Sequence, residues 1–468
     1  MREGDEERYG QLLTLREYGL ERLSEAGELE ATQAAHAEYF LSWVEQASTQ
    51  LSGAEQAHWL DCLDREYENV RAASAWLLQQ AGTSVDPAEQ ALRLCIALLG
   101  FWEIRGYVAE GLALLERALS NRQGVAPSIL AQALHGAAML ALVEDDNARA
   151  EGFLRECQLL FRESGDRAGM ANILQLQGNL ALVRSSYKLA RRMLEEALAM
   201  YQELGDGLSV TATREALAQV AITQGDYSKA QSLLEKNIAS YFARDEQYRV
   251  AYPLFLLARM LFLSQWDRVE ARARAEESLA LFRAVGNKRF IAYTLSLLGQ
   301  IVLIEERDAG NASSMVEESI AIFKSIADRF GTAEARIALA RVQSFEGKHE
   351  AARACYQESW QLLKTMDAKE VSAACLEGYG EVLVALGTRE ATNLAVKLWG
   401  TAATVRAAIV APMPQVYRTA YRQALALARE RLGEAAFQSA WAEGHSLPLE
   451  QVELSYREGS SPRSQAAS

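Results

Sequence analysis

The chain has 468 residues, of which 50% are hydrophobic and 24% charged, so its composition is that of a folded protein and not of a disordered one. Its 48 basic and 62 acidic residues give a net charge of −14, which argues against direct nucleic-acid binding, because phosphate backbones are bound through clustered Lys and Arg. The chain contains only 7 prolines, and because a proline costs about 3 kcal/mol in a helix interior, this scarcity predicts an all-α fold.

Residues 1–125 contain four segments that are similar to segments of one known family. The stretch from Leu12 to Leu23 resembles the end of the winged-helix region in bacterial AfsR- and MalT-like signalling ATPases, which belong to the STAND class and include many LuxR-type transcriptional regulators. Segments 36–40, 59–76 and 101–106 resemble the linker helices of that family. The resemblance implies a remnant of the winged-helix region over 1–27 and an N-terminal helical linker domain over 28–125.

Residues 126–387 contain an internal repeat. Small residues recur in steps of 40, 40, 40, 41, 41 and 40, at Ala138, Gly178, Ala218, Ala258, Gly299, Ala340 and Gly380. Alanines follow about twelve residues later, at Ala150, Ala190, Ala230, Ala271, Ala312 and Ala352. Small residues at fixed points let paired helices approach closely. The pattern resembles the tetratricopeptide (TPR) consensus with its period stretched to 40 residues, and predicts a right-handed superhelical solenoid of TPR-like helix pairs.

Two further signals divide each repeat. A glutamate recurs with the same period, and we expect it at a helix start; its positions are Glu116, Glu156, Glu196, Glu277, Glu318 and Glu358. Glycine next to Asp, Asn or Glu marks the expected turns, because glycine fits the left-handed residue that ends a helix and Asp or Asn caps the next one. These turns are Gly225-Asp226 and Glu346-Gly347 within repeats, and Gly165-Asp166, Gly205-Asp206 and Gly286-Asn287 between them.

The C-terminal part continues the family resemblance. Leu398-Trp399-Gly400 and the segment from Trp441 to Gly444 are similar to the closing segment of the same family, which implies a C-terminal helical cap over 388–447. The residues after Pro448 are polar and predict a flexible tail over 448–468.

The sequence departs from this family in its chemistry. It has no G-x-x-x-x-G-K-[ST] loop, since Gly347-Lys348 lacks the required earlier glycine, so nothing provides the backbone N–H groups and lysine that hold phosphates. The polar tail is too short for a helix-turn-helix. We therefore expect neither the ATPase nor the DNA-binding function of the relatives.

Catalytic and metal sites are not expected either. The five histidines and five cysteines are scattered and form no zinc-ligand spacing. The sequence therefore predicts no enzyme, no cofactor and no metal. No apolar signal segment follows the charged start, and the most apolar stretches are shorter than the roughly 20 residues that span a bilayer. We expect a cytoplasmic protein with reduced thiols and no membrane contact.

The inner surface of such a superhelix is lined by the first helix of each repeat. Positions six and three before the small residue and one after it should face inwards. They give a predicted partner groove of Asn172, Gln175, Asn179, Glu215, Gln219, Tyr252, Arg259, Tyr293, Ser296, Gln300 and Arg341. Phe255 has the same register, but it is also a candidate core residue. Amides, aromatic rings and arginines suit an extended peptide or a polar small molecule; the alternative is an ordinary amphipathic surface.

Two functions are compatible with these features of the sequence. The first is a sensor or interaction module of a bacterial signalling or transcriptional regulator. It would bind a protein, a peptide or a small-molecule inducer and report to an ATPase or DNA-binding partner chain. The second is a structural scaffold, or a degenerate regulator fragment, without a ligand of its own.

Overall fold

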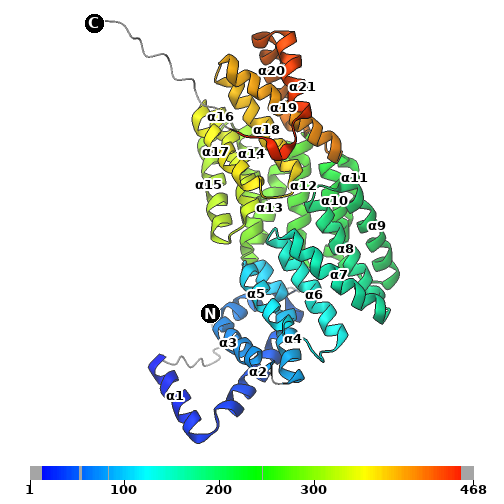
Figure 1. The fold of residues 1–468 in the computed structure, drawn as a ribbon, viewed down its shortest axis with the longest axis vertical. Helices are drawn as coiled ribbons and strands as arrows, with labels where there is room; N and C mark the ends of the chain where they lie inside the picture. Colours follow the sequence, from blue (N-terminus) through cyan, green and yellow to red (C-terminus); the bar gives the residue numbers. More distant parts are fainter. Residues whose placement is uncertain (1–12, 52–54, 83, 245, 455–468) are drawn as a thin grey trace, which may run out of the picture.

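The computed structural model describes residues 13–51, 55–82, 84–244 and 246–454 (Figure 1). Over these ranges the regular structure consists of 21 α-helices and two short 3-10 helices, with no strand. The all-α fold expected from the sequence is confirmed. None of the helices in the described ranges is both long and apolar enough to span a membrane.

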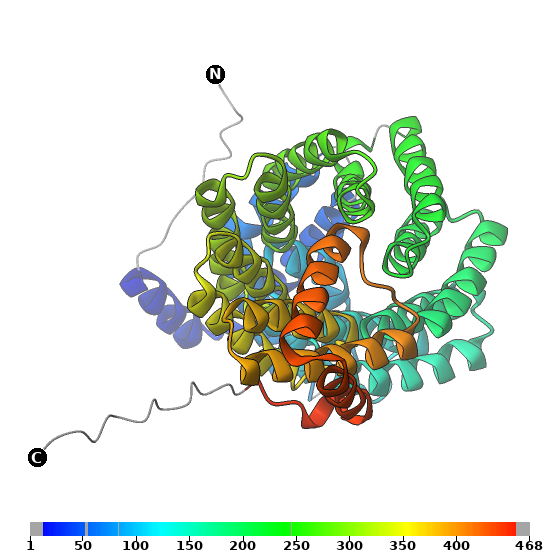
Figure 2. The same ribbon diagram turned by 90° about the horizontal axis from the view of Figure 1, so that it is seen from above.

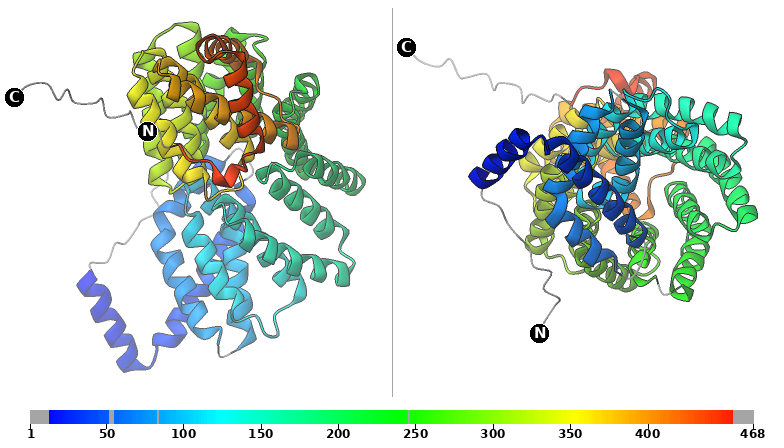
Figure 3. Two further views of the ribbon diagram at one scale, coloured as in Figure 1. Left: turned by 45° about the horizontal axis from the view of Figure 1, so that its top comes forward. Right: turned by 90° about the horizontal axis from the view of Figure 1, so that it is seen from below.

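The N-terminal helices form one end of the molecule (Figure 3). Their bounds are α1 Leu13–Ala26, α2 Leu29–Gln50, α3 Gln56–Gln80, α4 Val85–Arg105 and α5 Val108–Leu119. Trp102 of α4 is fully buried and donates its indole N–H to the hydroxyl of Tyr67 in α3, 2.7 Å away. The predicted winged-helix remnant is described only from residue 13, where α1 begins, and its first twelve residues lie outside the described ranges.

Helices α6 to α19 form seven consecutive pairs. The first helices of the pairs are α6 Pro127–Val143, α8 Arg167–Val183, α10 Gly207–Thr223, α12 Ala251–Ser264, α14 Lys288–Glu305, α16 Arg329–Phe345 and α18 Lys369–Ala385. The second helices are α7 Asn147–Ser164, α9 Tyr187–Leu204, α11 Tyr227–Ala243, α13 Arg268–Val285, α15 Ala309–Ser325, α17 His349–Leu363 and α19 Arg389–Ile409. A 3-10 turn, η1 Gln247–Val250, precedes α12.

The predicted small residues lie where the two helices of a pair meet. A Cβ on Gly178 of α8 would lie 2.6 Å from the side chain of Leu194 and 3.5 Å from the carbonyl oxygen of Ala190, both in α9. A Cβ on Gly299 of α14 would lie 2.9 Å from the carbonyl oxygen of Ala312 in α15. The small residue of one helix thus packs on the alanine region of the next, as close packing requires.

The predicted turns also form. Gly165 and Gly205 end their helices in the left-handed conformation, and Asp166 and Asp206 cap the helices that follow by accepting backbone N–H groups. One expectation was wrong: the repeated glutamates do not begin a helix. Glu196, for example, lies near the middle of α9, on its exposed side, because the helix already starts at Tyr187.

The helix pairs wind around a central space, which Figure 2 shows from above. Several polar contacts join parts of the chain that are distant in sequence, and two of them are made by arginines. The guanidinium of Arg289 in α14 donates to the carbonyl oxygen of Val143 at the end of α6, 2.9 Å away. Arg105 at the end of α4 donates to the carbonyl oxygen of Val285 at the end of α13, 3.1 Å away.

The C-terminal helices α20 Gln415–Leu432 and α21 Glu434–Ser446 follow the last pair. Helix α20 packs against α18 and α19 and also reaches α12 across the central space (Figure 2). After η2 Leu449–Gln451, Val452 and Leu454 are buried, and Trp360 of α17 donates its indole N–H to the carbonyl oxygen of Val452. The packed chain therefore continues beyond residue 447, where the expected cap ends; residues 455–468 of the expected tail lie outside the described ranges.

Candidate ligand-binding groove

The first helices of the repeats enclose a cavity of about 640 Å³ on the inner side of the ring. Its wall is formed by α8, α10, α12, α14, α16 and α18, and the start of α20 closes one side. Ten of the eleven predicted groove residues line it: Gln175, Asn179, Glu215, Gln219, Tyr252, Arg259, Tyr293, Ser296, Gln300 and Arg341. Asn172 does not line it. We call this cavity the groove.

The residue directly after the small residue points into the groove in five consecutive repeats. These residues are Asn179, Gln219, Arg259, Gln300 and Arg341. The side chains of Asn179, Gln219 and Arg259 have no hydrogen-bond or ion-pair partner in the described part of the chain. Each of them is partly exposed and lines the cavity. The other two members of this row are already engaged.

Tyr417 of α20 occupies the end of the row. Its hydroxyl donates to the side-chain oxygen of Gln300 at 2.8 Å. The guanidinium of Arg341 lies over its ring, 3.7 Å from the centroid, and also donates to Gln300 at 3.4 Å. The Tyr417 ring makes an edge contact with Phe262 of α12. Reasoning from the sequence missed Tyr417, because α20 lies outside the repeats and no periodic signal places it in the groove.

Besides Gln300 and Arg341, three more of the predicted residues have structural hydrogen bonds. The hydroxyl of Tyr201 lies 2.6 Å from the side-chain oxygen of Asn172 and 3.0 Å from that of Gln175, and it can donate to either. The carboxyl of Glu215 is buried and accepts from the hydroxyl of Tyr241 at 3.0 Å. Burial raises the pKa of Glu215 to about 7 despite this bond. These side chains are positioned by the fold before any ligand arrives.

The aromatic members form one wall. Tyr252 lies against Phe290 with 4.9 Å between ring centroids, and Tyr293 lies against Phe323 at 4.7 Å. Phe255 lines the groove, yet only 7% of its surface is exposed, so it also belongs to the core, as the sequence allowed. Aromatic faces beside amides that have no partner in the described chain make this surface of the groove amphipathic.

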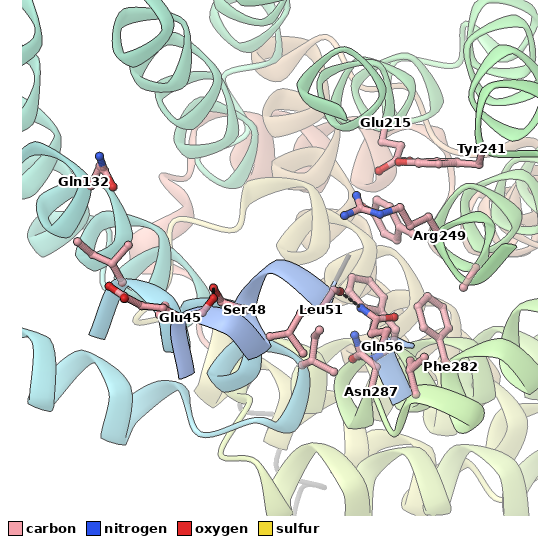
Figure 4. A pocket seen from close by; sticks show the side chains of 18 of the residues that line it. Glu45, Ser48, Leu51, Gln56, Gln132, Glu215, Tyr241, Arg249, Phe282 and Asn287 are labelled. Carbon is pink, nitrogen blue, oxygen red and sulfur yellow. Dashed lines mark hydrogen bonds between the residues drawn. The ribbon is translucent and has the colours of Figure 1, made fainter. Parts of the chain in front are cut away.

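A second cavity, of about 760 Å³, lies between α2–α4 of the N-terminal region and α10–α14 of the repeats (Figure 4). Glu215 borders both cavities, and Figure 4 shows Arg249 beside it. The side-chain amide of Gln56 is held by the carbonyl oxygen of Leu51 at 2.7 Å. No sequence signal indicated this cavity, because its walls come from segments that lie up to about 240 residues apart.

No cluster of three or more His, Cys, Asp and Glu side chains within the described ranges could hold a metal ion. All five cysteines are free, and four of them are buried. Burial raises the pKa of the Cys95 thiol to about 12.

Comparisons with known proteins agree with this architecture. Residues 169–241, from α8 to α11, match the family model described as Tetratricopeptide repeat. Candidate HTH-type transcriptional regulators of Mycobacterium tuberculosis and Mycobacterium bovis are 28% identical to this chain over 179 residues. That match covers 36% of this chain and a fifth of the relatives' length.

Two solved structures share the fold. A Rap protein complexed with Competence and Sporulation Factor has a TM-score of 0.51 at 13% identity, over 75% of this chain and 99% of the Rap chain. The Rap conjugation gene regulator of plasmid pLS20, in complex with the Phr* peptide, also has a TM-score of 0.51, at 11% identity, over 73% of this chain and 95% of the regulator. Together with the repeat match, these structures define the class: an all-α, TPR-like solenoid.

Proposed function

We propose that this chain is the sensor module of a bacterial regulator and that it binds an extended peptide in the groove. The observation that carries the proposal is the row of amide and guanidinium side chains one residue after each small residue. Asn179, Gln219 and Arg259 have hydrogen-bonding groups that no side chain or backbone group satisfies in the described part of the chain. Such groups in a cavity match the regularly spaced N–H and C=O groups of an extended peptide backbone.

The similarities to known proteins support this proposal. The pLS20 regulator, which shares the fold, was solved with a peptide. The mycobacterial relatives are named as candidate HTH-type regulators, which fits a cytoplasmic sensor that reports to a DNA-binding or STAND-type ATPase effector. A cavity of about 640 Å³ also lies within the roughly 300–1,000 Å³ of small-molecule sites, so a small inducer is the second candidate ligand.

The proposal is tested with a degenerate hexapeptide library. The purified chain is mixed with the library, the complex is separated by size exclusion, and retained peptides are identified by mass spectrometry. We expect a defined subset to be enriched and to raise the melting temperature, because a ligand that binds only the folded state stabilises it. The double variant Asn179→Ala/Gln219→Ala should lose most of this enrichment.

Gln202→Ala is the matched control, because this amide is exposed on α9 and lies outside the groove. It should retain the same peptides as the wild type. If the wild type enriches no peptide, or if the double variant retains the same set, the groove is not a peptide site and the scaffold alternative gains support.

A further inference from the structure

The second cavity has an apolar lining that comes from both the N-terminal helices and the repeats (Figure 4). On α4, Ile96, Gly100 and Ile104 are four residues apart, so they share one face of the helix, and all three line the cavity. On the repeat side, Phe282 of α13 and Phe290 of α14 stack with 5.1 Å between their ring centroids. The space between these helices therefore suits the apolar body of a ligand.

Gly100 helps to keep this space open because it has no side chain. It lies inside α4, where a glycine weakens the helix relative to an alanine. Its φ angle is not positive, so its backbone conformation is open to other residues. Packing does not require a glycine either, since an added Cβ would meet only the Cδ1 atom of Leu51, at an ordinary contact distance of 3.7 Å. The effect of the missing side chain in this structure is an open cavity.

Two arginines and two glutamates line the same cavity. Arg93 of α4 donates to both carboxylate oxygens of Glu45 in α2, at 2.8 and 2.9 Å, so this pair carries no net charge. Glu215 is buried, and burial raises its pKa to about 7, so its carboxyl is largely uncharged below that pH. Arg249 therefore lies in a cavity whose other charged groups largely cancel at slightly acidic pH.

The guanidinium of Arg249 points into the open middle of the cavity (Figure 4). It lies 3.8 Å from the carboxylate of Glu246, which also accepts from Arg244 at 3.1 Å. A guanidinium has five N–H donors, so Arg249 can bind an acidic group of a ligand without losing its contact with Glu246. A positive group thus lies beside the apolar lining.

We propose that the second cavity binds a small amphipathic acid, with its acidic group at Arg249 and its apolar body between α4 and the rings of Phe282 and Phe290. A guanidinium binds a carboxylate with two parallel hydrogen bonds, which a neutral head group does not provide. The volume of about 760 Å³ lies within the roughly 300–1,000 Å³ of small-molecule sites. The inference concerns a different cavity from the groove and does not rest on the proposed function, although Glu215 and Phe290 border both cavities.

The test compares octanoate with octanol, which have the same apolar chain and differ in the head group. Each is titrated into the full chain by isothermal titration calorimetry at pH 6, where octanoate is ionised and Glu215 is largely protonated. We expect one octanoate to bind per chain, about 10- to 100-fold more tightly than octanol, the range for a charge-assisted hydrogen bond. Arg249→Gln should remove this difference by weakening the binding of octanoate alone, and Arg249→Lys should keep part of it.

Gly100→Leu tests where the ligand binds. The new side chain occupies the cavity, so the variant should lose the binding of both compounds. Circular dichroism and chemical unfolding check that the variant folds, as expected from the space around Gly100. Gly152→Leu is the matched control, because it adds the same side chain inside α7, where a Cβ would meet nothing, and it should bind octanoate like the wild type.

Three results would overturn the proposal. Equal affinities of the wild type for octanoate and octanol overturn the assignment of an acidic ligand. Unchanged binding by a folded Gly100→Leu variant places the ligand elsewhere and overturns the site; if this variant does not fold, the result for Arg249→Gln decides alone. If the wild type binds neither compound, the proposal fails, while the peptide-library test of the groove is unaffected.

Discussion

The carboxyl of Glu215 offers a sharp test of the electrostatics between the two cavities. Its pKa of about 7 lies about 2.5 pH units above the ordinary value of 4.5, and burial is the main cause. A difference of this size corresponds to roughly 3–4 kcal/mol, at about 1.4 kcal/mol for each pH unit. Because the folded state holds the proton more tightly than the unfolded state, this contribution is fully present below about pH 4.5 and is lost as the pH rises through 7.

The perturbation is Glu215→Gln, which keeps the shape and an oxygen that accepts from the hydroxyl of Tyr241 but cannot ionise. We expect wild type and variant to have similar unfolding free energies at pH 5, where the carboxyl is neutral. At pH 8.5 the variant should be more stable by roughly 3–4 kcal/mol at most, because it avoids a buried charge. Urea unfolding followed by circular dichroism at both pH values measures this difference. Glu196→Gln, at an exposed site on α9, is the control and should show little change at either pH.

One outcome would contradict a protonated Glu215 in the folded chain. Figure 4 shows Arg249 beside Glu215. If the variant is less stable than the wild type at pH 8.5, Arg249 holds Glu215 in its charged form and the carboxyl works as part of an ion pair. A difference that does not vary with pH would mean that the side chain does not titrate between pH 5 and 8.5.

Three further predictions concern packing and buried charge, each measured by chemical unfolding. Gly444→Ala should destabilise the chain by about 1–3 kcal/mol, because its Cβ would collide with the backbone carbonyl of Lys397 in α19. Gly152→Ala, in open space within α7, should instead stabilise it by about 0.5–1 kcal/mol. Arg406→Met should destabilise it by about 3–5 kcal/mol, because it leaves the carboxylate of Glu377 buried without its partner. A Gly444→Ala variant as stable as the wild type would contradict the close approach of α19 and α21. An Arg406→Met variant as stable as the wild type would show that the ion pair with Glu377 does not stabilise the fold.

The repeat architecture could be predicted from the sequence because its cause is local and periodic. Gly178 and Ala190 show why: the contact between the two helices of a pair needs a small residue at fixed positions, so the requirement repeats every 40 or 41 residues. The glutamates recur with the same period, but they do not lie at the helix starts where the sequence placed them. Glu196, for example, lies on the exposed side of α9, away from its start. A period alone identifies a repeat but does not locate the helix ends.

The lining of the groove could be predicted for the same reason, as its register follows from the small residues. The sequence could not predict which of the lining residues lack a hydrogen-bond partner in the folded chain. That depends on Tyr417, which lies 117 residues from Gln300 along the chain, and on Tyr201, which engages Asn172 and Gln175 from the neighbouring helix. Contacts of this kind are set by tertiary packing and leave no periodic trace in the sequence. Whether the free residues bind a ligand stays a prediction.

The bond from Arg289 to the carbonyl oxygen of Val143 has a mechanical consequence. In a solenoid whose repeats contact only adjacent repeats, the superhelical pitch can change through small movements at many interfaces. This hydrogen bond links α14 directly to α6, which is four repeats earlier in the chain. Asp328 holds the Arg289 side chain in place by accepting a hydrogen bond from it. Opening the ring breaks a directional contact instead of bending a continuous series of soft ones. The separation of α6 and α14 is therefore set by a direct contact as well as by the repeats between them.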